Sequence, residues 1–491
     1  MKQLTGVDTS FLNLETGSSF GHVNSLSIYG WPSDDPDFDP YTTFRARIEA
    51  KLGRLEPLTR RLVEVPLGLD RPYWINDPDF DIDFHVRHIG VPGAGGPDEL
   101  GDLVGRLIGR PMDRDRPLWE CYVIEGLASG DFAVLLKMHH ATIDGAAGAL
   151  MLAALLDPNS DPADAEWSAD SRPSSIELLA RTAYGLARTP VKGIRLQAKV
   201  LNEIGRVTRR QGFPMLAQAM QKGLPGPAGD AVSKLLGGNP NDDEQVALPR
   251  LGAPRTPFNA SITPHRRFAY RTADLGRVKA IKGELGSTVN DVVMSVCAGA
   301  LRRYLEGHDA LPDQDLVAMI PVSIRTGDEE DMWSNRVSAI FSDLPTTTED
   351  PVERVSVVNA SMGAAKRQHD MLPAESIMEM SDLAPPALAV QAARLAARVR
   401  IADRTRPPAN LVISNVPGSR APLGMRSDIP LKHYYPVSTI VDGQGLNITV
   451  QSYCDQLDFG LVACRELVPD VWDLADLILD EIEVLAEAVG V

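Results

Sequence analysis

One stretch of the sequence limits the fold more than any other, because its hydrophobic period changes abruptly. Residues 131–139 read DFAVLLKMH, a short and mostly apolar run typical of a buried strand, and residues 145–157 read GAAGALMLAALLD, which is typical of a helix. His139, His140 and Asp144 lie at the junction of these two runs. A strand, a short polar turn and a helix in this order predict a mixed α/β fold.

The rest of the first third of the chain continues this alternation. Strands are expected at HVNSLSIYG (22–30), RRLVEVP (60–66), FDIDFHVRHIGV (80–91) and PLWECYVIEGL (117–127), and helices at 40–55 and 97–112. The turn-forming cluster ASGD (128–131) separates the last of these strands from the strand that ends at the histidines. The two strands are therefore predicted to form a hairpin.

The chain of 491 residues is too long for one ordinary core, and its 44% hydrophobic residues can fill two. We predict an N-terminal domain over 1–170, a connector over 171–250 and a C-terminal domain over 251–491. In the last of these, strands are expected at 315–324, 410–418 and 446–464, and helices at 287–307 and 470–490.

The connector has the opposite charge to the rest of the chain. Residues 171–235 hold eleven Lys and Arg against three acidic residues, whereas the whole chain has a net charge of −17. Its apolar residues recur at near-helical spacing, which predicts an amphipathic helical segment. Such a segment is either a solvated linker or a peripheral contact with a membrane, a lipid droplet or an acyl chain. The overall negative charge argues against nucleic acid as a partner.

Targeting features are not evident in the sequence. The first residues, MKQLTGVDTSFLNLETG, lack the apolar segment of a signal peptide, and no run of 18 apolar residues occurs. The four cysteines form no CxxC pair, so they are expected to be free thiols in a reducing compartment. A cytoplasmic location is expected, with peripheral contact at the inner membrane or lipid droplets through the connector.

The paired histidines can serve proton transfer, core packing or metal binding. Successive side chains on a strand point to opposite faces, so only one imidazole is expected to act as a base towards a hydroxyl or thiol. Asp144 could orient an imidazole or pair with an arginine, and Gly145 permits a sharp turn into the helix. A metal site made of His139, His140 and Asp144 is not expected, because adjacent histidines on a strand point apart. The sequence also offers no further ligand at HxxxH or HExxH spacing.

The sequence contains no G-x-S-x-G elbow and no Walker A loop. Covalent catalysis by serine and phosphoryl transfer therefore lack their usual signatures. A direct transfer without a covalent acyl-enzyme fits the sequence better.

HHATIDG (139–145) matches the HHxxxDG motif of the coenzyme A-dependent acyltransferase superfamily. Four further stretches make nearly the whole chain resemble the bacterial, and in composition the actinobacterial, wax ester synthase/diacylglycerol acyltransferases: GVDTSFLNLET (6–16), RPLWECYVIEGL (116–127), STVNDVVMSVCAGALRRYL (287–305) and NLVISNVPGSRAPL (410–423). The resemblance implies two domains similar to chloramphenicol acetyltransferase, around a central tunnel. It also implies acyl transfer from acyl-coenzyme A, as co-substrate and without a further cofactor, to diacylglycerol or a long-chain alcohol.

The resemblance also implies roles for single residues. His140 would be the general base, His139 and Asp144 would hold the loop, and Gly145 would turn it beside the substrate. Asn290 belongs to the family's ND pair, where it either stabilises an oxyanion or caps a helix. Other candidates are Ser438 as a second oxyanion donor, and Arg394, Arg398, Arg400, Arg404 and Arg406, which either bind the coenzyme A phosphates or form a solvated face.

Two alternatives to this function remain open on the sequence alone. The first is an acyltransferase that acts on a polyketide or carrier-bound hydroxyl. The second, from a different class, is a non-catalytic protein that binds lipid or coats droplets. The intact HHATIDG stretch argues against the second alternative.

Overall fold

The computed structural model describes residues 1–157, 167–184, 252–325, 333–371 and 386–491. Most of the expected connector lies outside these residues. Of its range, only 171–184 is described, and residues 175–184 of it are helical. None of the described helices is both long and apolar enough to span a bilayer.

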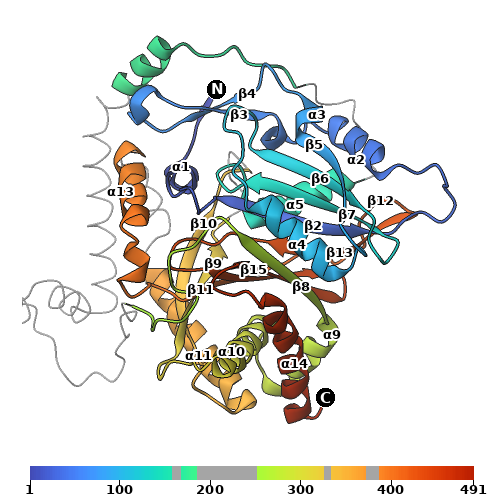
Figure 1. The fold of residues 1–491 in the computed structure, drawn as a ribbon, viewed down its shortest axis with the longest axis vertical. Helices are drawn as coiled ribbons and strands as arrows, with labels where there is room; N and C mark the ends of the chain where they lie inside the picture. The colour runs from blue at the N-terminus through green and yellow to red at the C-terminus, as the bar shows by residue number, and fades with distance from the viewer. Residues whose placement is uncertain (158–166, 185–251, 326–332, 372–385) are drawn as a thin grey trace, which may run out of the picture.

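The described residues form two six-stranded sheets and one small sheet, in two lobes (Figure 1). The first sheet has the order β12-β13-β2-β7-β6-β5, with bounds Gly424–Arg426, Ile429–Val437, His22–Tyr29, Phe132–His139, Trp119–Glu125 and Val86–Gly90. The second has the order β10-β9-β11-β14-β15-β8, with bounds Val337–Leu344, Leu316–Ser323, Leu411–Val416, Leu446–Tyr453, Gln456–Cys464 and Arg266–Asp274. The small sheet is β1-β4-β3, at Lys2–Gln3, Tyr73–Asn76 and Arg60–Val63.

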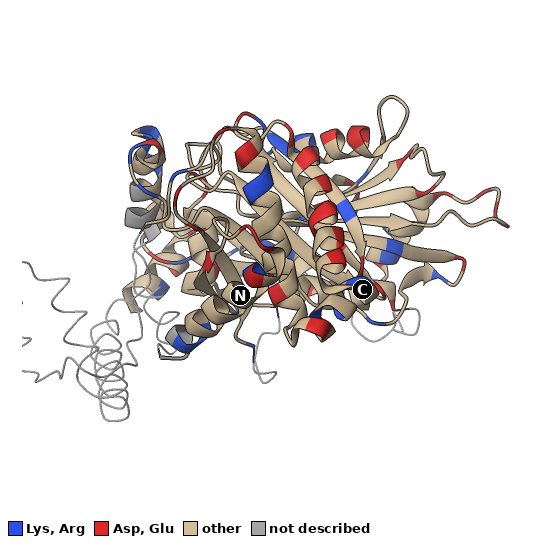
Figure 2. Cartoon of the chain, turned by 90° about the horizontal axis from the view of Figure 1, so that it is seen from below, with Lys and Arg blue, Asp and Glu red and all other residues tan. Residues whose placement is uncertain are grey.

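Helices flank both sheets. The first lobe carries α1 (Gly6–Asn13), α2 (Pro40–Glu49), α3 (Ile82–His85), α4 (Pro97–Ile108) and α5 (Gly145–Leu156), and the second carries α9 (Leu275–Leu285), α10 (Val289–Gly307), α11 (Pro351–Met371), α13 (Pro386–Arg398) and α14 (Val471–Val489). The largest apolar cluster lies between α10, α11, α14 and the second sheet. Helix α14 displays Asp and Glu along its length (Figure 2).

Close backbone packing joins the lobes at α4 and β8. A Cβ on Gly101 would lie 2.5 Å from the Phe268 carbonyl oxygen, and one on Gly105 would lie 2.6 Å from that of Arg266. Real Cβ atoms do not approach so closely, so these glycines allow α4 to lie directly on an edge strand of the other lobe. Apolar side chains of both lobes share one core cluster there.

The lobes do not divide the sequence as the expected domains do. Strands β12 and β13 belong by sequence to the C-terminal range, but β13 pairs antiparallel with β2 in the first sheet. The C-terminal part therefore completes the N-terminal sheet. Strand pairing joins residues far apart in sequence, so local patterns could not indicate this exchange.

Most expected elements are present. Strands β6 and β7 form the predicted antiparallel hairpin, with Trp119 opposite Met138, and the predicted helix after the histidines is α5. The expected strand over 80–91 is wrong in its first half, where residues 82–85 form the short helix α3 before β5. Asp81 accepts a hydrogen bond from the Asp83 N–H, and this cap starts a helical turn in place of a strand.

Candidate active site

The paired histidines lie where β7 ends. His139 is the last residue of the strand and lies opposite His22 of β2, and His140 begins the turn that follows. The His140 N–H donates to the Gly21 carbonyl oxygen at 2.6 Å. Because the chain leaves the strand at this point, the two imidazoles have different surroundings.

The His139 ring is buried and held on both sides. Its Nδ1 accepts a hydrogen bond from the Ala141 N–H at 3.0 Å, and its Nε2 lies 3.1 Å from Glu15 Oε1. A Cβ on Gly21 would lie 3.0 Å from His139 Nε2, so glycine leaves the room that this ring occupies. Neither nitrogen of His139 is open to a substrate.

Glu15 supports this arrangement as a carboxylate. Burial disfavours its charged form, but hydrogen bonds and charge from His139, Arg114 and the Gly21 N–H outweigh burial and lower the pKa of Glu15. Its Oε2 accepts from Arg114 at 2.7 Å, and its Oε1 accepts from the Gly21 N–H at 2.9 Å. Glu15 thus links the His139 ring to the chain segments on either side of it.

His140 as a whole residue is partly exposed, and its ring lies flat on Phe11, with ring centroids 4.0 Å apart and planes 7° apart. Its Nδ1 lies 3.0 Å from Asn335 Oδ1. Burial lowers the pKa of His140 below its ordinary value of 6.5, although Asp144 and Asn335 oppose the shift. At neutral pH the ring is therefore uncharged.

Asp144 forms an ion pair with an arginine. Among the described residues, no hydrogen bond joins Asp144 to the His140 ring. It caps α5 by accepting from the Ala147 N–H at 2.8 Å, and its Oδ2 accepts from Arg325 at 2.7 Å and from the Arg336 N–H at 3.1 Å. The sequence left open whether Asp144 orients an imidazole or pairs with an arginine, and the structure shows the pair with Arg325.

Gly145, Ser438 and Asn290 lie in different parts of the structure. Gly145 is the first residue of α5, directly after the turn, and it has no positive φ, so the turn does not use the backbone freedom of glycine. A Cβ there would meet Val416 at an ordinary 3.7 Å. Ser438 follows β13, whose end pairs with the start of β2 opposite the end of β7, so it lies at the same end of the sheet as His139.

Asn290 is the second residue of α10. The cap of this helix is made by Thr288 and Asp291, each of which bonds the other's backbone N–H. Among the described residues, no hydrogen bond joins Asn290 to His140 or its partners.

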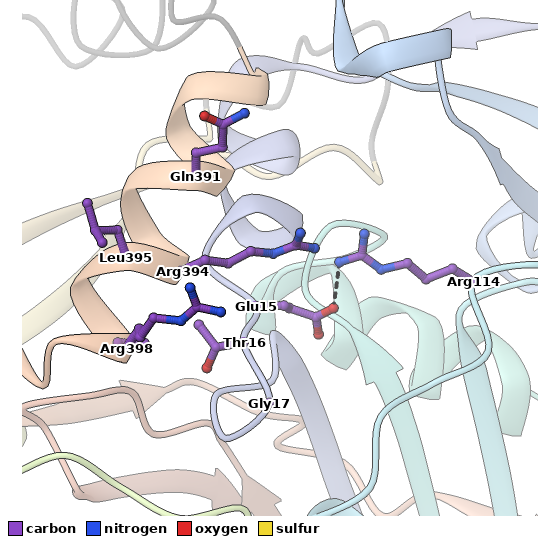
Figure 3. A pocket seen from close by; sticks show the side chains of 9 residues that line it. Glu15, Thr16, Gly17, Arg114, Gln391, Arg394, Leu395 and Arg398 are labelled. Atoms are coloured by element: carbon purple, nitrogen blue, oxygen red, sulfur yellow. Dashed lines mark hydrogen bonds and ion pairs between the residues drawn. The ribbon is translucent and has the colours of Figure 1, made fainter.

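A cavity of about 640 Å³ opens beside this region (Figure 3). It is lined by Glu15, Thr16, Gly17, Arg114, Gln391, Arg394, Leu395, Ala397 and Arg398. Figure 3 shows the guanidinium groups of Arg394 and Arg398 directed from α13 towards the loop at Glu15–Gly17. Glu15 is the residue that both lines this cavity and contacts His139. His140 is not part of the lining, so a tunnel that passes His140 stays a prediction.

Several site residues were missed by sequence reasoning. Asp8, Phe11 and Glu15 all lie within GVDTSFLNLET, a stretch that resembles the family. The resemblance marked this stretch but assigned no function to its residues. Asn335 is 195 positions from His140, and no local pattern marks that contact. Among the described residues, no group of three His, Cys, Asp or Glu side chains is arranged to hold a metal ion.

Comparisons with known proteins agree on one family. Residues 4–293 match the profile of the wax ester synthase/diacylglycerol acyltransferase catalytic domain, and residues 333–486 match the WS/DGAT C-terminal domain. A Mycobacterium tuberculosis protein provisionally named diacylglycerol O-acyltransferase is 36% identical over 99% of this chain and 100% of its own length. The O-acyltransferase WSD of Acinetobacter baylyi is 32% identical, over 98% of this chain and 96% of its own.

Solved structures extend the comparison to the fold. The wax ester synthase/diacylglycerol acyltransferase from Marinobacter aquaeolei VT8 is similar with a TM-score of 0.67 and 28% identity, over 100% of both chains. The first condensation domain of the calcium-dependent antibiotic synthetase has a TM-score of 0.56 at 16% identity, over 100% of this chain and 97% of its own. The expected two-lobed fold is confirmed by these likenesses.

Proposed function

Because the chain belongs to the wax ester synthase/diacylglycerol acyltransferase family, we propose that it moves a long-chain fatty acyl group from acyl-coenzyme A to the hydroxyl of diacylglycerol or a long-chain alcohol. The acyltransferase class follows from the family. The acceptor and the roles of single residues are the proposal. The observation that carries it is the environment of His140, whose ring stacks on Phe11, is uncharged at neutral pH and has a partner at Nδ1.

In this mechanism His140 Nε2 takes the proton of the acceptor hydroxyl while its oxygen attacks the thioester carbonyl carbon. The tetrahedral intermediate carries its negative charge on the former carbonyl oxygen. It collapses by breaking the carbon–sulfur bond, and the coenzyme A thiolate takes the proton back from the imidazolium. General-base assistance of this kind is worth roughly 100- to 10,000-fold in rate.

His139 is the weaker candidate for the base. Its Nδ1 already accepts from a backbone N–H and its Nε2 faces Glu15, which leaves no free lone pair for a substrate. With Glu15, His139 instead supports the turn that carries His140. Asp144, through its cap of α5 and its pair with Arg325, supports the other end of the same turn.

The cavity beside Glu15 suits the phosphates of coenzyme A. Arginine binds phosphate through charge-assisted hydrogen bonds, and Glu15 already neutralises Arg114. No ion pair joins Arg394 or Arg398 to a carboxylate within the described part of the chain. Their charges therefore favour an anionic ligand in this cavity.

For the oxyanion, Ser438 is favoured over Asn290. Ser438 lies at the end of the sheet that also carries the histidines, whereas Asn290 lies in the first turn of α10. Gly145 lies beside Val416 of the other lobe, and we keep it as a candidate contact for the acyl chain. We keep a cytoplasmic location as part of the proposal, with the basic connector as the candidate for peripheral contact with the inner membrane or lipid droplets, on its charge alone.

An acceptor panel tests the proposed function. Purified protein receives palmitoyl-coenzyme A with diolein, hexadecanol or a polyketide diol, and thiol release and the lipid product are both measured. Thiol release that depends on diolein or hexadecanol, with the matching triacylglycerol or wax ester, supports the proposal. Release that depends on the polyketide diol alone would instead assign the enzyme to carrier-bound or polyketide hydroxyls.

A further inference from the structure

A buried amide from the second lobe joins His140 to a buried carboxylate. Asn335 is fully buried, and its Oδ1 lies 3.0 Å from His140 Nδ1. Its Nδ2 donates to Asp8 Oδ1 at 2.6 Å and to the His140 carbonyl oxygen at 2.6 Å. The Asn335 N–H donates to the same Asp8 oxygen at 3.2 Å. The amide thus uses both of its hydrogen atoms and its oxygen.

The neighbours of the amide fix which way it faces. Asp8 Oδ1 and the His140 carbonyl oxygen are both acceptors, so both need the NH₂ group. If the amide were turned over, its oxygen would face those two acceptors and its NH₂ would face the imidazole. The observed orientation is therefore the one that leaves no acceptor facing another acceptor.

This orientation decides which ring nitrogen of His140 carries the proton. The Asn335 oxygen can only accept, so Nδ1 must be the protonated nitrogen of the neutral ring. Nε2 then has a free lone pair. The stacking of the ring on Phe11 further restricts the direction in which that lone pair points.

Asp8 is itself fixed by the start of α1. It forms a capping box with Thr5, in which the Asp8 N–H donates to the Thr5 hydroxyl and the Thr5 N–H donates to Asp8 Oδ2. Asn335 lies just before β10 of the other lobe. The amide therefore reaches His140 only when the two lobes are packed together.

From this geometry we propose that Asn335, held by Asp8, is a positioning residue that keeps His140 in the Nδ1–H form, with Nε2 free as the base. The inference rests on the proposed acyl transfer and deepens it. It assigns no contact between Asn335 and the substrate. Loss of the amide is expected to lower kcat and to leave KM for acyl-coenzyme A nearly unchanged.

The first measurement needs no turnover. Protein labelled with ¹⁵N at histidine is examined by NMR at neutral pH, and the His140 signals are identified from their loss in His140→Ala. Shifts of a protonated Nδ1 and an unprotonated Nε2 are expected in the wild type. A protonated Nε2 would overturn the proposal even in a fully active enzyme, and absence of activity in the wild type would overturn only the proposed function.

The second measurement compares variants by kcat, KM and the pH profile. Asn335→Leu removes the amide at similar volume and is expected to lower kcat roughly 10- to 100-fold, the usual cost of removing a group that orients a histidine. Asn335→Asp places a carboxylate beside Nδ1, which favours the imidazolium, so the acid limb of kcat should move to higher pH. The control is Asn259→Leu, since Asn259 is equally buried and donates to two carbonyl oxygens away from His140.

Asn259→Leu should lower stability without moving the acid limb. The proposal is wrong if Asn335→Leu keeps the wild-type kcat. It is also wrong if the acid limb of kcat lies at the same pH in Asn335→Asp as in Asn259→Leu. The exchange Asp8→Asn with Asn335→Asp restores one amide and one carboxylate. It should recover activity relative to Asn335→Asp alone, and no recovery would contradict the part assigned to Asp8.

Discussion

Asp144 Oδ2 accepts a hydrogen bond from the Arg325 guanidinium at 2.7 Å, and this ion pair crosses from the turn after the histidines to the second lobe. The exposed fractions of the two side chains are 5% and 14%. Asp144 also caps α5 and accepts from the Arg336 N–H. One carboxylate therefore fixes the helix, the turn and the lobe contact.

Asp144→Ala should lower the free energy of unfolding by about 3 kcal/mol or more, because it removes both the cap of α5 and the carboxylate that pairs with the largely buried Arg325 guanidinium. The matched control is Asp39→Ala. Asp39 caps α2 at an exposed position, so its loss should cost only about 1 kcal/mol. Urea unfolding of the two variants checks this, and equal losses would contradict a structural role for the pair.

The pH dependence of activity should follow the uncharged state of His140. Burial lowers the pKa of this ring below 6.5, so the base form persists as pH falls through 6.5. We expect kcat/KM to stay level there and to decline only at lower pH. The profile is measured with a saturating acceptor and varied acyl-coenzyme A. A decline centred above pH 6.5 would be inconsistent with the burial of this ring.

Arg394 and Arg398 should affect binding of the acyl donor and not the chemical step. Changing both to Ala is expected to raise KM for acyl-coenzyme A by roughly tenfold or more at low salt, since one charge-assisted hydrogen bond is worth about 1.5–3 kcal/mol. The effect should shrink as salt rises. The control changes Arg277, which pairs with Glu483 on the surface. A lower kcat with unchanged KM would remove these arginines from the donor site.

Local patterns were enough to predict the elements that carry the histidines, but helix α1, which holds Asp8 and Phe11, and strand β10 were not predicted. The hairpin β6–β7 and the helix α5 follow from hydrophobic period and turn residues, and these place His139 and His140 at a strand end. The two rings do have different surroundings, but the reason is that His140 begins the turn after the strand, and not the expected alternation along the strand. Only the short helix α3 departs from its pattern, because the Asp81 cap and the alternation of apolar residues indicate different structures.

Contacts between distant segments could not be predicted in this way. Asn335 meets His140 across 195 positions, and β13 crosses into the first sheet to pair with β2. Both depend on how the lobes pack, which no local propensity encodes. Asp144 illustrates the intermediate case, since a pair with an arginine was one of its two expected roles, but the sequence indicated neither which arginine nor the cap of α5.

The general-base role of His140 is tested most directly by comparing His140→Gln with His88→Gln in coenzyme A thiol release at saturating diolein. His88 is half-exposed and pairs with Glu125, away from the site, so its variant is the matched control. Loss of the base should lower kcat of His140→Gln by roughly 100- to 10,000-fold, with KM for acyl-coenzyme A little changed. Thiol release by His140→Gln at the rate of His88→Gln would contradict the account.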